Sequence, residues 1–189
     1  MSSVNLIEKS RTVMSVIMQP GDANFLGKVF GGKLLSLIDL CAYQSAARYS
    51  GEACVTASFD QVDFLEPIEV GEVVTLQGRV TFVGRSSMEI TIEVDAENLL
   101  SGDRRRTNIA RVTMVAIRDG KPVPVPKFVP ATEAEKRDFV IGRLRREQRP
   151  IAAAEREALA NRVAGMDDEA LDALLTAKSL LAALSAPGS

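Results

Sequence analysis

The sequence predicts an α+β domain in which an antiparallel sheet surrounds one long helix, followed by a helical extension. Residues 33–49 show a helical apolar stripe, and several strand-like segments with short connections follow them. Short connections favour antiparallel pairing. The helix is the one candidate within residues 1–130 that can cover a face of the sheet. Residues 131–189 are rich in Ala, Leu, Glu and Arg, so they are predicted to form a separate helical unit.

Composition narrows the classes of function. Of 189 residues, 46% are apolar, which suffices for a core, and a net charge of −2 predicts no general attraction to nucleic acid or anionic lipid. There is no histidine, so a Ser-His-Asp triad or a Cys-His pair within the chain is excluded. Cys41 and Cys54 have neither a disulfide framework nor metal-ligand spacing, so no metal is expected.

The chain start and the hydropathy pattern bear on location. The first 13 residues, MSSVNLIEKSRTV, are polar and lack the apolar segment of a secretory signal. No apolar run is long enough to cross a bilayer. We therefore expect a protein of the reducing cytoplasm.

The first elements are a short strand and the long helix. Residues 11–18 read as a strand that ends before Pro20, and residues 33–49 read as a helix that closes at Gly51. Steps of three and four residues predict one buried stripe on this helix, made of Leu34, Ile38, Cys41, Ser45 and Tyr49.

The following strands are identified by alternation. Residues 55–64 change phase after Phe59, which indicates a bulge, and residues 73–84 form the next strand. In residues 87–97 the apolar side chains are expected inward and the polar ones outward, these being Met88, Ile90, Ile92 and Val94 against Glu89, Thr91, Glu93 and Asp95.

The last strand and the tail complete the chain. Residues 98–106, NLLSGDRRR, are predicted as a loop before a strand over residues 107–117. In the tail, Thr132 and Glu135 have the spacing of a capping box, and Pro150 is expected to interrupt the helix. Three tail helices are predicted, over residues 132–148, 151–165 and 166–184.

A glycine-rich segment precedes one acid on the helix, in the sequence GDANFLGKVFGGKLLSLID over residues 21–39. The pattern G-x-x-x-x-G-K over residues 27–33 permits a phosphate cradle, but Leu34 stands where Ser or Thr would hold magnesium. The required strand before it is also replaced by a turn. Glycines at a helix start leave backbone N–H groups that bind an anion or polarise a carbonyl oxygen.

Asp39 has two interpretations. It lies opposite the predicted buried stripe, so it is either a solvated residue of an amphipathic helix or a functional carboxylate. Asp is a poor residue inside a helix, and its neighbours Leu35 and Leu40 make this side only weakly polar. Such a side resembles a subunit interface, where an unpaired carboxylate is costly unless it has a function.

One family shares these residues. The motif D-A-N-x-x-G-x-V-F-G-G-x-L-L-x-x-I-D, residues 22–39, resembles the hotdog-fold acyl-CoA thioesterases, closest to the YciA-like branch and the cytosolic acyl-CoA hydrolases. Segments 62–74, 83–94 and 110–117 resemble later strands and turns of that family. The resemblance covers about residues 8–127, and the tail lies outside it.

The resemblance implies a fold, an activity and a catalytic site. Two units pair into a continuous sheet, and active sites lie where they meet. Asp39 would be the catalytic acid, as general base on water or as nucleophile, with Asn24 contributed across the interface. The N–H groups of Gly31 and Gly32 would polarise the thioester carbonyl. The products would be a carboxylic acid and coenzyme A, which places the protein in lipid metabolism.

The resemblance also implies how the substrate is held. The hairpin of Gly84, Arg85, Ser86 and Ser87 would touch the nucleotide end of coenzyme A, with Arg85 supplying charge for phosphate. No metal or redox cofactor is expected, since coenzyme A is part of the substrate. A homodimer is the expected minimum, and a trimer of dimers is implied by the family. An alternative is a non-catalytic acyl-CoA-binding hotdog module whose helical tail recruits a partner.

The arginine run at residues 104–106 has two interpretations as well. It is either a solvated loop or a patch that attracts the phosphates of coenzyme A from a neighbouring subunit.

Overall fold

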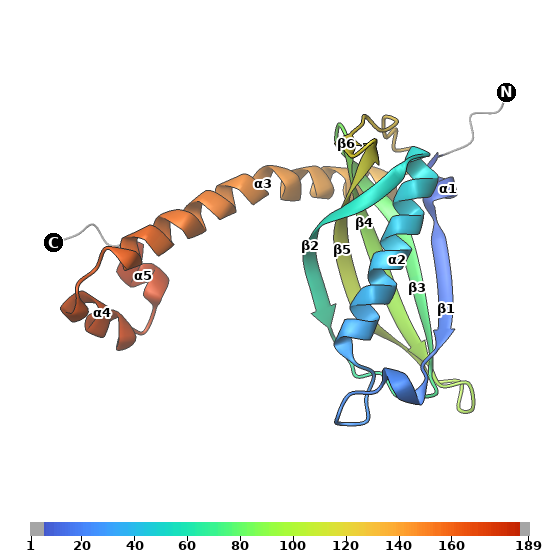
Figure 1. The fold of residues 1–189 in the computed structure, drawn as a ribbon, viewed down its shortest axis with the longest axis horizontal. Helices are drawn as coiled ribbons and strands as arrows, with labels where there is room; N and C mark the ends of the chain where they lie inside the picture. The colour runs from blue at the N-terminus through green and yellow to red at the C-terminus, as the bar shows by residue number, and fades with distance from the viewer. Residues whose placement is uncertain (1–5, 186–189) are drawn as a thin grey trace. The chain divides into compact units, whose positions relative to one another are not determined.

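The computed structural model describes residues 6–185, which divide into two compact units after Gly142. The first unit contains most of the elements (Figure 1), namely α1 (Leu6–Ser10), β1 (Thr12–Ile17), η1 (Pro20–Asp22), α2 (Gly31–Ser50), β2 (Ala53–Phe64), β3 (Val73–Val83), β4 (Ser87–Glu97), β5 (Arg104–Arg118) and β6 (Lys121–Pro122). The long helix α3 (Glu133–Ala164) begins in this unit. Its later turns, with α4 (Asp168–Leu175) and α5 (Leu180–Ser185), belong to the second unit.

The sheet has the strand order β1-β3-β4-β5-β2, with β6 paired to β5. Every pairing between the described strands is antiparallel. The sheet curves around α2, which crosses its concave face (Figure 1). The predicted α+β architecture of one helix and an antiparallel sheet is therefore confirmed.

The helix α2 is held to the sheet by its buried stripe. All five residues of the predicted stripe are buried, these being Leu34, Ile38, Cys41, Ser45 and Tyr49. Gly78 of β3 lets the helix approach closely, because a Cβ there would lie 2.8 Å from Cys41 Sγ. Gly51 ends the helix in the left-handed conformation at φ 74°.

The bulge predicted in the first long strand is present. The pairing of β2 with β5 shifts register between Thr56 and Ser58 and again between Phe59 and Gln61. Such shifts increase the local bend of a strand. They lie in the part of β2 that runs beside α2.

Burial of β4 differs from the prediction on one face. The inward residues Met88, Ile90, Ile92 and Val94 are buried as expected, but Glu89, Thr91 and Asp95 on the other face are buried too. The first turns of α3 account for part of this cover. The Phe139 ring lies 5.0 Å from that of Phe82, and a Cβ at Gly142 would lie 2.5 Å from Phe82 Cβ.

The loop predicted over residues 98–106 is shorter than expected, because β5 begins within this range. The arginines there are paired: Arg105 contacts Glu72 at 2.6 Å, and Arg106 contacts Asp95 at 2.5 Å. Charge pairing across strands stabilises a strand that composition alone would place in a loop. The run is therefore not a solvated loop, while its attraction for the phosphates of coenzyme A stays a prediction.

Two of the helix boundaries predicted for the tail are wrong. The helix α3 continues through Pro150, and the helix predicted over residues 166–184 is divided into α4 and α5. Proline removes one backbone donor, and on an exposed helix water can satisfy the carbonyl that loses its partner. The capping box is confirmed, since Thr132 Oγ1 accepts from Glu135 N at 3.2 Å and Glu135 Oε2 accepts from Thr132 N at 3.0 Å. Within residues 6–185, no helix is long and apolar enough to cross a membrane.

Candidate active site

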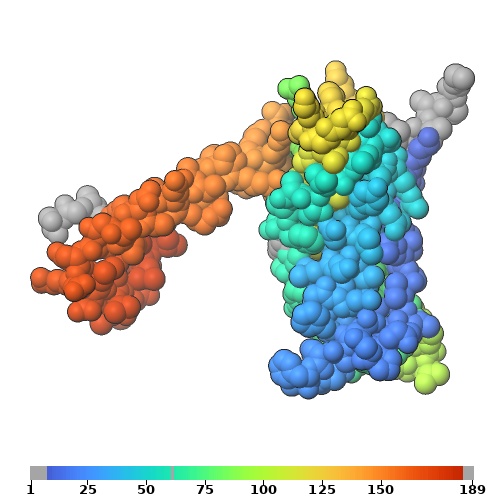
Figure 2. Space-filling model, viewed as in Figure 1, coloured from blue at the N-terminus to red at the C-terminus, as the bar shows by residue number. Residues whose placement is uncertain are grey.

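Asp39 lies on the side of α2 that the sheet does not cover, and it is half-buried. The hydroxyl of Thr56 on β2 donates a hydrogen bond to Asp39 Oδ1. Figure 2 shows α2 and β2 side by side on this surface. The carboxylate is therefore held in one orientation by a neighbouring strand rather than extended freely into water.

The surroundings of this pair are apolar and exposed. Leu40 and Tyr43 of α2 and Phe59 of β2 are all large, exposed hydrophobic residues, and Phe59 shares the inner face of the sheet with Thr56. Large apolar side chains left exposed in this way indicate a candidate interaction site. Strand β2 lies at the edge of the sheet, so its outer side has no strand partner within the described residues.

The start of α2 presents backbone donors. The N–H groups of Lys33 and Leu34 both donate to Phe30 O, at 3.0 and 3.3 Å. Gly31 and Gly32 precede them as the first two residues of the helix, where N–H groups have no carbonyl of the preceding turn to bind. These amides can therefore polarise a carbonyl oxygen.

Asn24 shapes the loop before the helix. Its Oδ1 accepts hydrogen bonds from the N–H groups of Leu26 and Lys28, at 2.9 and 3.2 Å. Its backbone N–H donates to Lys28 O at 2.7 Å. In a single chain the carbonyl of this amide is thus committed to its own loop.

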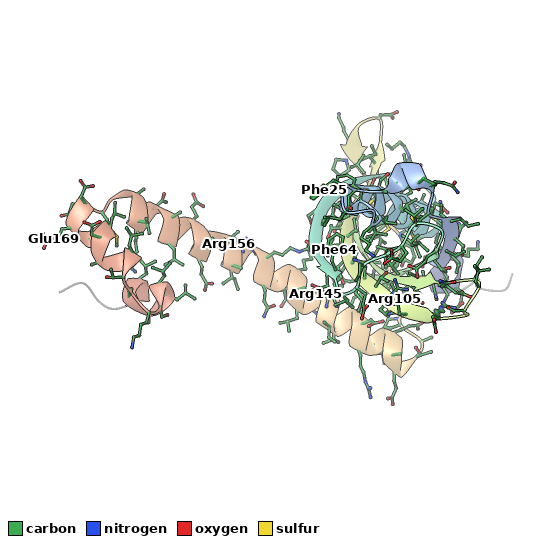
Figure 3. All side chains as sticks on the ribbon, turned by 90° about the horizontal axis from the view of Figure 1, so that it is seen from below. Phe25, Phe64, Arg105, Arg145, Arg156 and Glu169 are labelled. Carbon is green, nitrogen blue, oxygen red and sulfur yellow. The ribbon has the colours of Figure 1, made fainter. Side chains whose placement is uncertain are left out.

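A pocket of about 370 Å³ lies beside the start of α2. It is lined mainly by apolar side chains, with a few polar groups, from the loop before α2, the end of β2 and the following loop: Asn24, Leu26, Lys28, Val29, Gly31, Leu34, Phe64, Leu65, Glu66, Pro67, Ile68 and Asn108. Figure 3 views this end of the sheet and labels Phe25, Phe64 and Arg105. Asp39 is not among the lining residues.

The predicted catalytic residues do not meet within one chain. Asp39 is two turns further along α2 than Gly31, about 12 Å at the helical rise per residue. One thioester carbonyl cannot contact both positions. Asn24 and Gly31 line the pocket together, whereas Asp39 pairs with Thr56.

The hairpin predicted to contact coenzyme A lies at the other end of the sheet. It connects β3 to β4, where Gly84 N donates to Ser87 O at 2.7 Å. The carbonyls of Arg85 and Ser86 accept from Val125 and Ala116, so the backbone of the turn is fixed. The Arg85 side chain is exposed, so any ligand that it binds lies on the surface of the chain.

Three other kinds of site find no support. The segment over residues 27–33 follows a short 3-10 turn, and the sheet is antiparallel, so the phosphate-cradle interpretation is wrong. Burial raises the pKa of Cys41 to about 11, and burial also raises the pKa of Cys54. Both thiols are thus poor nucleophiles near neutral pH. In the described part of the chain, no group of three or more acidic or thiol side chains is arranged to hold a metal.

Thr56 is a functional candidate that the sequence did not identify. A threonine in a strand is ordinary, since it favours β-structure. Its contact with Asp39 depends on β2 returning beside α2, which no local pattern shows. The nearest signal in the sequence was the bulge predicted after Phe59, three residues further along the strand.

Comparisons with known proteins place the chain in a family. Residues 26–101 match the model of the Thioesterase superfamily. The uncharacterized acyl-CoA thioester hydrolase YkhA of Bacillus subtilis is 46% identical over 129 residues, 68% of this chain and 75% of that protein. A crystal structure of an apo-hexameric acyl-CoA thioesterase is 44% identical with a TM-score of 0.75, over 78% of this chain and 96% of that one.

An acyl-CoA hydrolase from Staphylococcus aureus is also similar. Its structure with butyryl coenzyme A, coenzyme A and coenzyme A disulfide is 30% identical with a TM-score of 0.72, over 84% of this chain and 97% of that one. Alanine variants of that enzyme were solved at an asparagine, an aspartate and a threonine. These three are spaced along that chain as Asn24, Asp39 and Thr56 are along this one. This chain has the hotdog fold and belongs to the thioesterase superfamily.

Proposed function

We propose that the protein is an acyl-CoA thioesterase, which hydrolyses acyl-CoA to a carboxylic acid and coenzyme A. The observation that carries this proposal is the Asp39 carboxylate, half-buried on an open apolar surface and oriented by the Thr56 hydroxyl. A fixed carboxylate with one oxygen left for water is the acid–base group that a chain without histidine can offer. Family membership supports the same reaction.

The proposed chemistry needs one base and one oxyanion site. Asp39 takes a proton from water as the water oxygen attacks the thioester carbonyl, and the C–S bond then breaks to release the thiolate, which is protonated. In the alternative course, Asp39 attacks the carbonyl itself, the C–S bond breaks to release the coenzyme A thiolate, and water then hydrolyses the resulting anhydride. In both courses the N–H groups of Gly31 and Gly32 stabilise the developing oxyanion.

The site is proposed to form between two copies of the chain. Since Asp39 and the Gly31 amide are about 12 Å apart along one helix, a second copy must bring its own helix start, with Asn24, to Asp39. The exposed apolar residues around Asp39 and the open edge of β2 support such pairing. A homodimer is the minimum, and a trimer of dimers agrees with the hexameric relative.

The remaining assignments follow from this assembly. The hairpin from Gly84 to Ser87 would bind the nucleotide of coenzyme A, with Arg85 facing phosphate across the interface. No metal or redox cofactor takes part in the proposed reaction. The cytoplasm, where acyl-CoA is made and used, is the proposed location.

Release of free thiol from a panel of acyl-CoAs tests the proposal. Wild type is expected to release coenzyme A, and Asp39→Asn, which keeps the shape but removes the base, is expected to lower kcat by about 100-fold or more. Asp60→Asn is the matched control, because Asp60 also accepts a threonine hydroxyl but lies outside the proposed site. No thiol release by wild type would favour a binding module, and equal rates in both variants would exclude Asp39 as the catalyst.

A further inference from the structure

The pocket beside the start of α2 contains a buried polar atom that has no partner. Asn108 of β5 is wholly buried and lines this pocket. Its Nδ2 donates to Asp63 O at 3.0 Å, which fixes the amide. Its Oδ1 accepts no hydrogen bond from any residue in the described range.

An unpaired acceptor in such a place is unusual. Buried polar side-chain atoms nearly always have a partner, because burying one unsatisfied costs free energy. Across the strand pair, Asn108 is opposite Phe64, and most of the pocket wall is apolar. Asn24 and Lys28 of the pocket wall carry donors, but no described residue donates to Asn108 Oδ1, so a donor is sought in whatever fills the pocket.

The other unpartnered buried atom provides a contrast. Ser45 Oγ lies between α2 and β3, where a Cβ at Gly78 would come within 2.7 Å of it. No described pocket reaches Ser45. Both atoms are buried, but Ser45 lies between packed elements, whereas Asn108 is part of the pocket lining.

We propose that Asn108 Oδ1 accepts a hydrogen bond from an N–H or O–H group of the substrate that enters this pocket. This inference rests on the proposed thioesterase function. The pocket is continuous with the Gly31 backbone, so a substrate whose carbonyl binds there extends into it from one side of the thioester. Two parts of the substrate can supply the donor: an amide N–H of the pantetheine arm, or a hydroxyl on the acyl chain.

The proposal makes the pocket selective against plain alkyl groups. A site built to hydrogen-bond a substrate group rejects the analogue without it more strongly than an apolar site rejects a change of size. The pocket wall is also held in place. Arg105 donates to Pro67 O at 2.7 Å, and Lys28 pairs with Glu69. The wall therefore resists rearrangement that would hide the amide.

Matched thioesters test the inference on the wild-type protein. The first pair joins one acyl group to N-acetylcysteamine, which carries an amide N–H, or to an alkanethiol of equal length. The second pair joins coenzyme A to a 3-hydroxyacyl group or to its saturated counterpart. A preference in kcat/KM of about tenfold for the donor-bearing member is expected in one pair, which identifies the source.

Asn108→Leu is expected to abolish that preference, and Ser45→Ala is the control that should retain it. The Asn108→Leu variant should also bind coenzyme A about tenfold more weakly by calorimetry if the donor is the pantetheine amide. Equal kcat/KM within both pairs on wild type would overturn the inference, whether or not the variant folds. So would a preference that Asn108→Leu retains. Failure of the thioesterase proposal is distinct, because it appears as no thiol release from any thioester.

Discussion

At the scale of single residues, the Thr56 hydroxyl decides how Asp39 presents its carboxylate. It binds Oδ1 and leaves the other oxygen for water. A hydrogen bond to a charged group contributes about 1.5–3 kcal/mol, which corresponds to a factor of about 10 to 100 in rate if it acts in the transition state. Thr56 is a positioning residue in this proposal, since it touches the base and not the substrate.

Thr56→Val is expected to lower kcat by about tenfold or more with little change in KM, because binding contacts remain while the base loses its orientation. Thr56→Ser restores the hydroxyl and should recover most of kcat. Thr113→Val is the control, since Thr113 binds Asp60 in a similar way on the neighbouring strand at 2.9 Å. A parallel loss in Thr56→Val and Thr113→Val, not rescued by serine, would indicate a general effect on the sheet instead.

Sequence patterns located one half of this site and missed the other. The helical stripe placed Asp39 opposite the core, and the family resemblance singled it out with Asn24. Thr56 and Asn108 carry no signal of their own, since each is an ordinary polar residue of an alternating strand. Thr56 has a role because β2 returns beside α2, and Asn108 has one because it lines the pocket. Both depend on contacts between segments that are distant in sequence, which periodicity does not reveal.

At the scale of elements, the start of β5 anchors the loop that forms the pocket wall. Arg105 binds Glu72 through both oxygens, at 2.6 and 2.8 Å, and also holds Pro67 O. Hydrogen bonds from Arg105 are the largest influence on Glu72, and they hold its pKa below the ordinary 4.5. The same end of the sheet holds Asp95. Burial is the largest single influence on this carboxyl and alone would raise its pKa, but the hydrogen bonds and charges of Arg106 and Arg104 together outweigh burial and lower it.

These shifts predict acid sensitivity. A carboxyl with a lowered pKa in the folded state contributes stability that is fully present above its unfolded pKa and is lost as pH falls through the folded value. For Glu72 the loss therefore begins below pH 4.5. Arg105→Gln is expected to lower the free energy of unfolding by about 2 kcal/mol at pH 7 and by less at pH 3, measured by urea denaturation. An equal loss at both pH values would contradict the assignment.

The sequence predicted elements well where apolar periodicity was clear. It predicted them poorly where a segment is highly charged or exposed. The helix stripe and the inner face of β4 followed from spacing alone. The start of β5 was not predicted, because three consecutive arginines are typical of a loop. Their partners Glu72 and Asp95 are known only from the structure. Pro150 did not end α3, because the carbonyl that loses its partner on an exposed helix can bind water. The boundary at residue 130 between domain and extension stays a prediction.

At the scale of the whole molecule, the compact unit extends into α3. Phe139 lies between the rings of Phe82 and Phe128, at 5.0 and 5.1 Å, and Asp138 binds Arg79 at 2.5 Å. A chain ending at 142 is therefore expected to keep the melting temperature of the sheet domain. A chain ending at 130 should lose about 1–2 kcal/mol, because it lacks the half-buried Phe139 ring that contacts Phe82 and Phe128. Equal thermal stability of the two truncations would place the boundary at 130.

Assembly is the property on which the proposed site depends, and mixing of inactive variants measures it. If Asp39 of one copy works with Asn24 of its partner, a heterodimer of Asp39→Ala and Asn24→Ala chains contains one intact site and one doubly defective site. Refolding the two variants together in equal amounts is expected to restore about a quarter of wild-type thiol release, since half the dimers are mixed and each has one working site.

Each variant refolded alone supplies the baseline of this measurement, and light scattering checks that both assemble as wild type does. If the two residues served the same site from one chain, every site in a mixed dimer would carry one substitution, and activity would stay at the baseline. The open edge of β2 and the 12 Å, or about two turns of α2, that divide Asp39 from Gly31 favour the shared arrangement. Recovery of activity on mixing would therefore locate the catalytic centre between two chains.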